Sequence, residues 1–176
     1  MRMSYRSSCF LLITASLLVV IAATHSFQMV SYVGEDTQIK LVFSYGVGAR
    51  NVLDTFSKTF TKDMIGDPPI TIRMWLTEEE NSRIEDKLNE IGFFDRGFTK
   101  LAWGVGVIGE KTPYSTFYLK VQYGLQVKEL KWADRYIFFQ DDKVMSDLNE
   151  LNDLIQSIIM AKPEYQKLPE PRGAYS

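Results

Sequence analysis

The stretch that decides the fold runs from Ile70 to Ile91 and reads ITIRMWLTEEENSRIEDKLNEI. Its first seven residues alternate between two sides, and the apolar side consists of Ile70, Ile72, Met74 and Leu76. The other side consists of Thr71, Arg73 and Trp75. A period of two is typical of a half-buried strand, so we predict a β-strand over residues 70–76.

A helix is predicted directly after this strand. Thr77 and Glu80 have the spacing of a capping box, in which the Thr hydroxyl accepts from the Glu80 amide and the Glu80 carboxylate accepts from the Thr77 amide. The following apolar residues have the period of an amphipathic helix: Ile84, Leu88 and Ile91. Gly92 is a natural stop for this helix.

Further strands are predicted on both sides of this unit. Before it, alternation indicates strands over Gln38–Tyr45 and Thr55–Met64, the second with Phe56, Phe60 and Met64 on one face. After it, Gly124 is expected to turn a strand over Tyr114–Tyr123 into its partner over Leu125–Trp132. Two weaker candidates are a Gly-rich strand over Leu101–Ile108 and a short edge over Tyr136–Phe139.

A second helix is predicted near the C-terminus. Asp141 and Asp142 are candidate caps, Pro163 ends the pattern, and the apolar stripe consists of Val144, Leu148, Leu151, Ile155 and Ile158. The order of strands, helix, strands and helix lacks regular strand–helix alternation. We therefore predict an α+β fold, with a mostly antiparallel sheet of five to seven strands and two amphipathic helices packed on one face.

The first 26 residues have the pattern of an export segment. Arg2 and Arg6 precede an uncharged run, Phe10–Ala23, which reads FLLITASLLVVIAA. As a helix this run spans about 21 Å, less than the roughly 30 Å of a bilayer core, which favours a cleaved signal peptide over an N-terminal membrane anchor. Both alternatives place the rest of the chain outside the cytoplasm. We expect residues 27–162 to form one α+β domain and residues 163–176 to form a proline-containing tail.

The composition of residues 27–176 excludes several common chemistries. The chain of 176 residues has one Cys and one His, and both Cys9 and His25 lie before this part. Disulfides, thiolate nucleophiles, His-based triads and Cys/His zinc sites are therefore excluded there. The same part carries 18 basic and 22 acidic residues, a net charge of −4, and has no basic cluster, which argues against binding to nucleic acid.

Two motifs suggest a cofactor or a metal site, but a Gly-rich strand and a solvated loop explain them better. Gly104, Gly106 and Gly109 fit the G-x-G-x-x-G pattern of dinucleotide sites, but a strand pattern follows them where that site requires a helix. Asp63 and Asp67 flank a loop without the spacing of a calcium loop. We expect no cofactor, no metal and no assigned catalytic residue.

The aromatic residues suggest a binding surface. If the strands over 70–76 and 114–123 are neighbours, one sheet face carries Arg73, Trp75, Tyr114 and Tyr118, and Trp132 on the hairpin is a further candidate. Such a face suits a glycan or a protein partner. The alternative is that loops or the tail cover these residues as a second small core.

Two segments carry a resemblance to a family. Tyr45–Ile84, YGVGARNVLDTFSKTFTKDMIGDPPITIRMWLTEEENSRI, and the ending EYQKLPEPRGAYS resemble parts of small exported proteins of unknown function, mostly prokaryotic and often archaeal. The resemblance implies a free-living prokaryotic source. It implies no activity, cofactor or catalytic residue.

Three functions are consistent with these patterns. The first is an extracytoplasmic, non-enzymatic domain that binds a ligand or a partner. The second is an exported hydrolase that uses two carboxylates, which would require two Asp or Glu side chains about 5–10 Å apart in a cleft. The third is a structural or envelope-assembly component attached to the membrane through its N-terminal segment.

Overall fold

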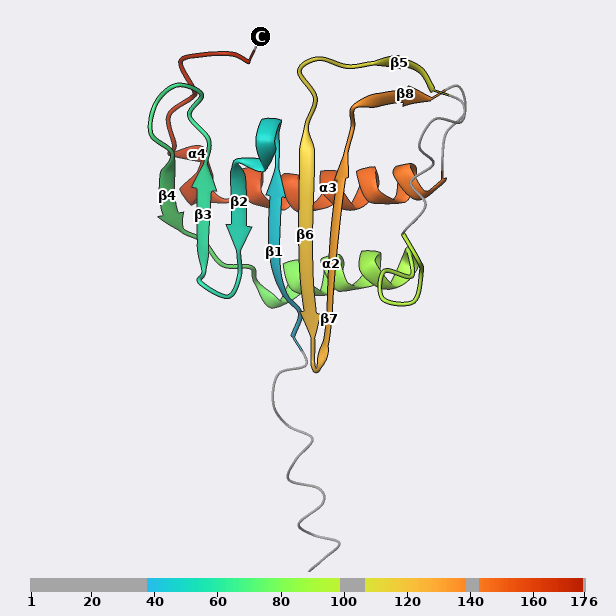
Figure 1. Ribbon diagram of the computed structural model, residues 1–176. Helices are drawn as coiled ribbons and strands as arrows, with labels where there is room; N and C mark the ends of the chain where they lie inside the picture. Colours follow the sequence, from blue (N-terminus) through green and yellow to red (C-terminus); the bar gives the residue numbers. More distant parts are fainter. Residues whose placement is uncertain (1–37, 99–106, 139–142, 176) are drawn as a thin grey trace, which may run out of the picture. The chain divides into compact units, whose positions relative to one another are not determined.

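Six strands form one antiparallel sheet in the order β4-β3-β2-β1-β6-β7 (Figure 1). The computed structural model describes residues 38–98, 107–138 and 143–175. In chain order the sheet strands are β1 (Lys40–Tyr45), β2 (Asn51–Asp54), β3 (Thr59–Lys62), β4 (Ile70–Arg73), β6 (Thr116–Tyr123) and β7 (Gln126–Ala133). A second sheet pairs β5 (Val107–Glu110) with β8 (Tyr136–Phe138). The helical elements are η1 (Val47–Ala49), α2 (Glu78–Glu90), α3 (Lys143–Ala161) and α4 (Pro163–Gln166).

The core lies between one face of the sheet and the two long helices. Phe43 on the central strand stands opposite Leu53 of β2 and Leu119 of β6, and all three side chains are fully buried. They belong to the same hydrophobic cluster as Leu88 of α2 and Ile155 of α3. In the view of Figure 1 both helices lie behind the sheet. The six-stranded antiparallel sheet and the two helices confirm the predicted α+β class.

The local signals around α2 are confirmed. The Thr77 hydroxyl accepts from the Glu80 amide at 3.2 Å, and the Glu80 carboxylate accepts from the Thr77 amide at 2.7 Å. Ile84 and Leu88 are buried, and the helix gives way at Ile91 to Gly92, whose φ is +63°. A positive φ costs glycine little, which explains why the chain reverses here.

The predicted hairpin is also confirmed. Tyr123 of β6 pairs with Gln126 of β7, so the loop has two residues, Gly124 and Leu125. Gly124 has a φ of +55°, and Leu125 is not among the residues with positive φ. This is the pattern of a type II′ turn, whose twist matches that of the paired strands.

The region between β1 and β4 differs from its prediction. Residues 55–58 form a turn and not the start of a strand, because the Asp54 carboxylate accepts from the amides of Phe56 and Ser57 at 2.8 and 3.1 Å. Phe56 is consequently 42% exposed, whereas Phe60 is fully buried. The prediction also missed β2, a strand of only four residues.

Several predicted features lie outside the described residues. They are the N-terminal segment, the glycine motif over residues 104–106, most of the strand predicted over 101–108, and the Asp141-Asp142 cap. The α3 stripe itself is described, and Leu148, Leu151, Ile155 and Ile158 are buried. Within the described part of the chain, no helix has the length and apolar character needed to cross a membrane.

The C-terminal tail lies against β3 and the loop that follows it. The Lys62 ammonium, on a side chain only 5% exposed, donates to the Pro169 carbonyl at 2.9 Å and lies 3.4 Å from the Glu170 carboxylate. Arg172 pairs with Asp67 at 2.8 Å, and the Tyr175 hydroxyl donates to Asp63. The two aspartates considered for a metal site are thus engaged by the tail.

Candidate ligand-binding site

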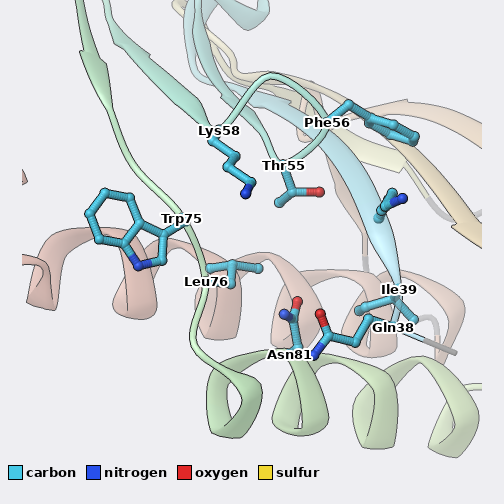
Figure 2. Close-up of a pocket in the computed structure, with 9 residues that line it drawn as sticks. Gln38, Ile39, Thr55, Phe56, Lys58, Trp75, Leu76 and Asn81 are labelled. Carbon is cyan, nitrogen blue, oxygen red and sulfur yellow. The ribbon is translucent and has the colours of Figure 1, made fainter. Parts of the chain in front are cut away.

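A cavity lies where the strand ends meet the start of α2 (Figure 2). Its volume is about 390 Å³. Its polar and aromatic wall consists of Gln38, Thr55, Phe56, Lys58, Trp75 and Asn81. Ile39 and Leu76 add apolar surface. A concave site with aromatic walls and a few polar groups is the usual form of a small-ligand site.

Backbone pairing fixes the β2–β3 side of this cavity. The Leu41 amide donates to the Thr55 hydroxyl at 2.7 Å, and the Thr55 amide donates back to the Leu41 carbonyl at 2.9 Å. Thr55 therefore stays beside the start of β1. Lys58, with a φ of +55°, closes the turn, and its carbonyl accepts from the Met74 amide at 3.0 Å.

Alternation after β4 positions Trp75. Met74 is only 1% exposed and packs in the core, so the next side chain points outward and Trp75 is 54% exposed. Figure 2 shows the Trp75 indole and the Lys58 side chain on the same side of the cavity. The buried Met74 thus fixes the backbone next to Trp75 and holds the indole at the cavity.

The opposite side of the cavity carries two amide side chains, Gln38 and Asn81. Asn81 lies in the first turn of α2, where its backbone amide donates to the Thr77 carbonyl at 2.9 Å. Its Oδ1 atom is buried and accepts no hydrogen bond from any described residue. Figure 2 shows Gln38 at the same end of the cavity. The site thus offers an unused acceptor beside an exposed amide.

The lining is positively charged. It contains Lys40 and Lys58 and no carboxylate. A second, smaller cavity of about 50 Å³ contains one carboxylate, that of Glu85. Neither cavity therefore offers the carboxylate pair that a glycoside hydrolase requires. In the described ranges, no group of three or more His, Cys, Asp or Glu side chains is arranged to hold a metal ion.

The sheet order separates the residues that were predicted to form one aromatic surface. β3, β2 and β1 lie between β4 and β6, so the two strands are about 19 Å apart at the usual strand spacing. Arg73 and Trp75 are exposed together at the β4 edge, while Tyr118 lies on β6. The condition that these strands are neighbours is not met, and only Trp75 belongs to the cavity.

Tyr118 and Tyr114 are held by local contacts of their own. The Lys131 ammonium lies 5.4 Å from the centre of the Tyr118 ring, and the Arg135 guanidinium lies 5.6 Å from that of Tyr114. Burial, a hydrogen bond with Glu129 and the charge of Glu129 raise the pKa of Tyr118. Both rings are half-buried beside cations and are less available to a ligand than Trp75.

Trp132 is a core residue. It is 5% exposed and stacks on Phe117, with ring centres 5.1 Å apart and planes 17° from parallel. The two residues are paired across β6 and β7, which places Trp132 on the helix-covered face of the sheet. The prediction of Trp132 as a surface candidate is therefore corrected.

Sequence reasoning missed most of this site. Gln38, the turn residues Thr55 and Lys58, and Asn81 come from three separate segments, and none lies in a motif. Only Trp75 gave a signal, because its place in an alternating strand predicted an outward side chain. Comparisons with protein-family models and with curated proteins find no match for this chain. A proposal for its function therefore rests on the residues of the cavity.

Proposed function

We propose that this protein is an extracytoplasmic, non-enzymatic domain that binds a glycan in the cavity beside Trp75. The single observation that carries the proposal is an indole 54% exposed on a cavity of about 390 Å³. An aromatic face of this kind suits the apolar face of a sugar ring. The extracytoplasmic location rests on the export pattern of residues 1–26.

The polar lining supports a sugar rather than a purely apolar ligand. Gln38 and Asn81 supply amide groups that can donate to and accept from hydroxyl groups. The exposed Lys58 favours a glycan that carries carboxylate groups.

The lining also supports binding without catalysis. Hydrolysis of a glycosidic bond needs an acid and a second carboxylate on either side of that bond. The cavity beside Trp75 contains neither. We therefore expect a bound oligosaccharide to be recovered intact.

The proposal is tested by titrating the exported protein with neutral and uronic-acid oligosaccharides in a calorimeter. We expect the acidic series to bind more tightly, and Trp75→Ala to lose about tenfold or more in affinity through loss of the stacking surface. Val127→Ala is the matched control, because Val127 is 53% exposed and lies outside the cavity. Equal affinities of the two variants, or no binding in either series, would contradict the proposal.

A further inference from the structure

The exposed large hydrophobic side chains gather at one end of the six-stranded sheet. Among the described residues six such side chains are strongly exposed, and five of them lie at this end: Phe56 (42%), Trp75 (54%), Tyr123 (38%), Leu125 (104%) and Val127 (53%). The sixth, Met160, lies on α3. Soluble surfaces usually carry such residues singly, so their concentration at one end points to a partner.

The strand registers place these residues together. Lys40 pairs with Gln122, so the β6–β7 turn lies beside the start of β1. The hydrogen bonds between Leu41 and Thr55 bring the β2–β3 turn to the same end. Thr59 pairs with Arg73, which brings Trp75 there as well. We call this end, with its five exposed hydrophobic residues, the apolar end.

The apolar residues form two groups that stand apart. One group is at the β2–β3 turn and the end of β4, and the other is at the β6–β7 turn. With the sheet order given, the two turns are three strand spacings apart, about 14 Å. A small ligand in the cavity beside Trp75 does not reach Leu125, whereas an extended flat surface contacts both groups at once.

The N-terminal part of the sequence gives a reason to expect a lipid surface near the apolar end. It enters β1 at the apolar end, through Gln38 (Figure 1). The apolar run Phe10–Ala23 ends 14 residues before Gln38. Those residues span at most about 50 Å when fully extended, so in the anchor alternative, in which the run is retained in a bilayer, the apolar end stays within that distance of the lipid.

We propose that the apolar end rests on the surface of a lipid bilayer. Leu125 and Val127 enter the boundary of the acyl chains, and Trp75 and Tyr123 lie at headgroup level, where amphipathic aromatic rings are favoured. Lys58, exposed in the β2–β3 turn at this end, supplies a positive charge for lipid phosphates. The contact is mainly apolar, because the five exposed side chains of the apolar end are uncharged.

The test uses the full chain in phosphatidylcholine vesicles. Cys9→Ser removes the single natural cysteine, and an environment-sensitive fluorophore is attached through Leu125→Cys. Two control positions are Ala174→Cys, exposed beside the tail contacts at the opposite end of the sheet, and Met160→Cys on α3. We expect emission at position 125 to shift to shorter wavelength, with quenching by nitroxide-labelled lipid several-fold stronger than at positions 160 and 174.

Two outcomes would overturn the proposal. One is a fluorophore at position 125 that is as exposed to water as those at the control positions. The other is shielding at position 125 that is equally strong without vesicles, which would assign the apolar end to contact between copies of this chain. Leu125 is fully exposed, so its replacement is not expected to disturb folding. Because Trp75 and Lys58 serve both proposals, oligosaccharide titration of the same variants is done without vesicles, so that failure of one proposal is distinguishable from failure of the other.

Discussion

Glu80 and Lys162 join the first turn of α2 to the residue that follows α3. Their Oε2 and Nζ atoms are 2.5 Å apart, and the side chains are only 20% and 11% exposed. The same carboxylate oxygen accepts from the Thr77 amide and completes the helix cap. Burial alone would raise the pKa of Glu80, but the hydrogen bonds from Lys162 and Thr77 and the charge of Lys162 outweigh it and lower the pKa below 4.5.

This pair predicts a pH-dependent contribution to stability. Because the pKa of Glu80 is lower in the folded state than in the unfolded state, the contribution is present above about pH 4.5 and is lost as the pH falls through the folded-state value. Glu80→Gln should lower the free energy of unfolding by about 1–2 kcal/mol at pH 7 and by much less in acid. Urea unfolding at both pH values measures this. Glu79→Gln on the same helical turn is the control, and an equal loss for both variants would contradict the assignment.

The two phenylalanines predicted for one strand face should differ sharply on truncation. Phe60 is fully buried against the Tyr165 ring, with centres 5.6 Å apart, so Phe60→Ala should cost about 3–5 kcal/mol. Phe56→Ala removes an exposed ring and should change stability by no more than about 0.5 kcal/mol. Thermal or urea unfolding distinguishes them. Comparable losses would mean that residues 55–58 continue the strand.

The contributions of the C-terminal tail and of Lys62 to the free energy of unfolding should depend on each other. Removing residues 169–176 takes away the carbonyl and carboxylate partners of a nearly buried ammonium, leaves its contact with the Tyr165 ring, and should cost about 2–4 kcal/mol. Lys62→Met should then recover part of that loss, because it removes the uncompensated charge, whereas in the full-length chain it has little effect or is destabilising. A double-mutant cycle by urea unfolding measures the coupling. No difference between the two backgrounds would show that the tail does not stabilise Lys62.

The β6–β7 turn should depend on glycine at its first position. The φ of +55° at Gly124 is unfavourable for a residue with a Cβ atom, so Gly124→Ala should destabilise the protein by about 1–2 kcal/mol. Leu125→Ala next to it should be within about 0.5 kcal/mol of the natural chain, because that side chain contacts only solvent in the described structure. Unfolding midpoints test both. A tolerant Gly124 would indicate a different turn type.

The features that the sequence predicted well are those encoded by neighbouring residues. The cap of α2 needs only Thr77 and Glu80, and the hairpin needs only Gly124 between two alternating runs. Exposure of Trp75 followed from alternation within one strand. In each case the residues that interact are separated by a few positions, so the periodicity of the sequence contains the needed information.

Features that depend on long-range pairing were not available from the sequence. The predicted aromatic surface required β4 beside β6, but the chain inserts β3, β2 and β1 between them. Trp132 lies in an alternating stretch of sequence, as Trp75 does, yet it is buried because its face of the sheet is the one the helices cover. The strand β2 was missed because Asn51–Asp54 is too short to show a period, and its place is fixed by pairing with β1 and β3.

The position of β1 has a mechanical consequence. It is the first strand of the sheet along the chain, yet it lies inside the sheet and bonds to both β2 and β6. A pull on the chain ahead of Gln38, directed along β1, acts at right angles to the hydrogen bonds of two antiparallel ladders and loads them together in shear. An edge strand pulled sideways would instead lose its bonds one at a time. A domain held at this point therefore bears the load on two antiparallel ladders at once.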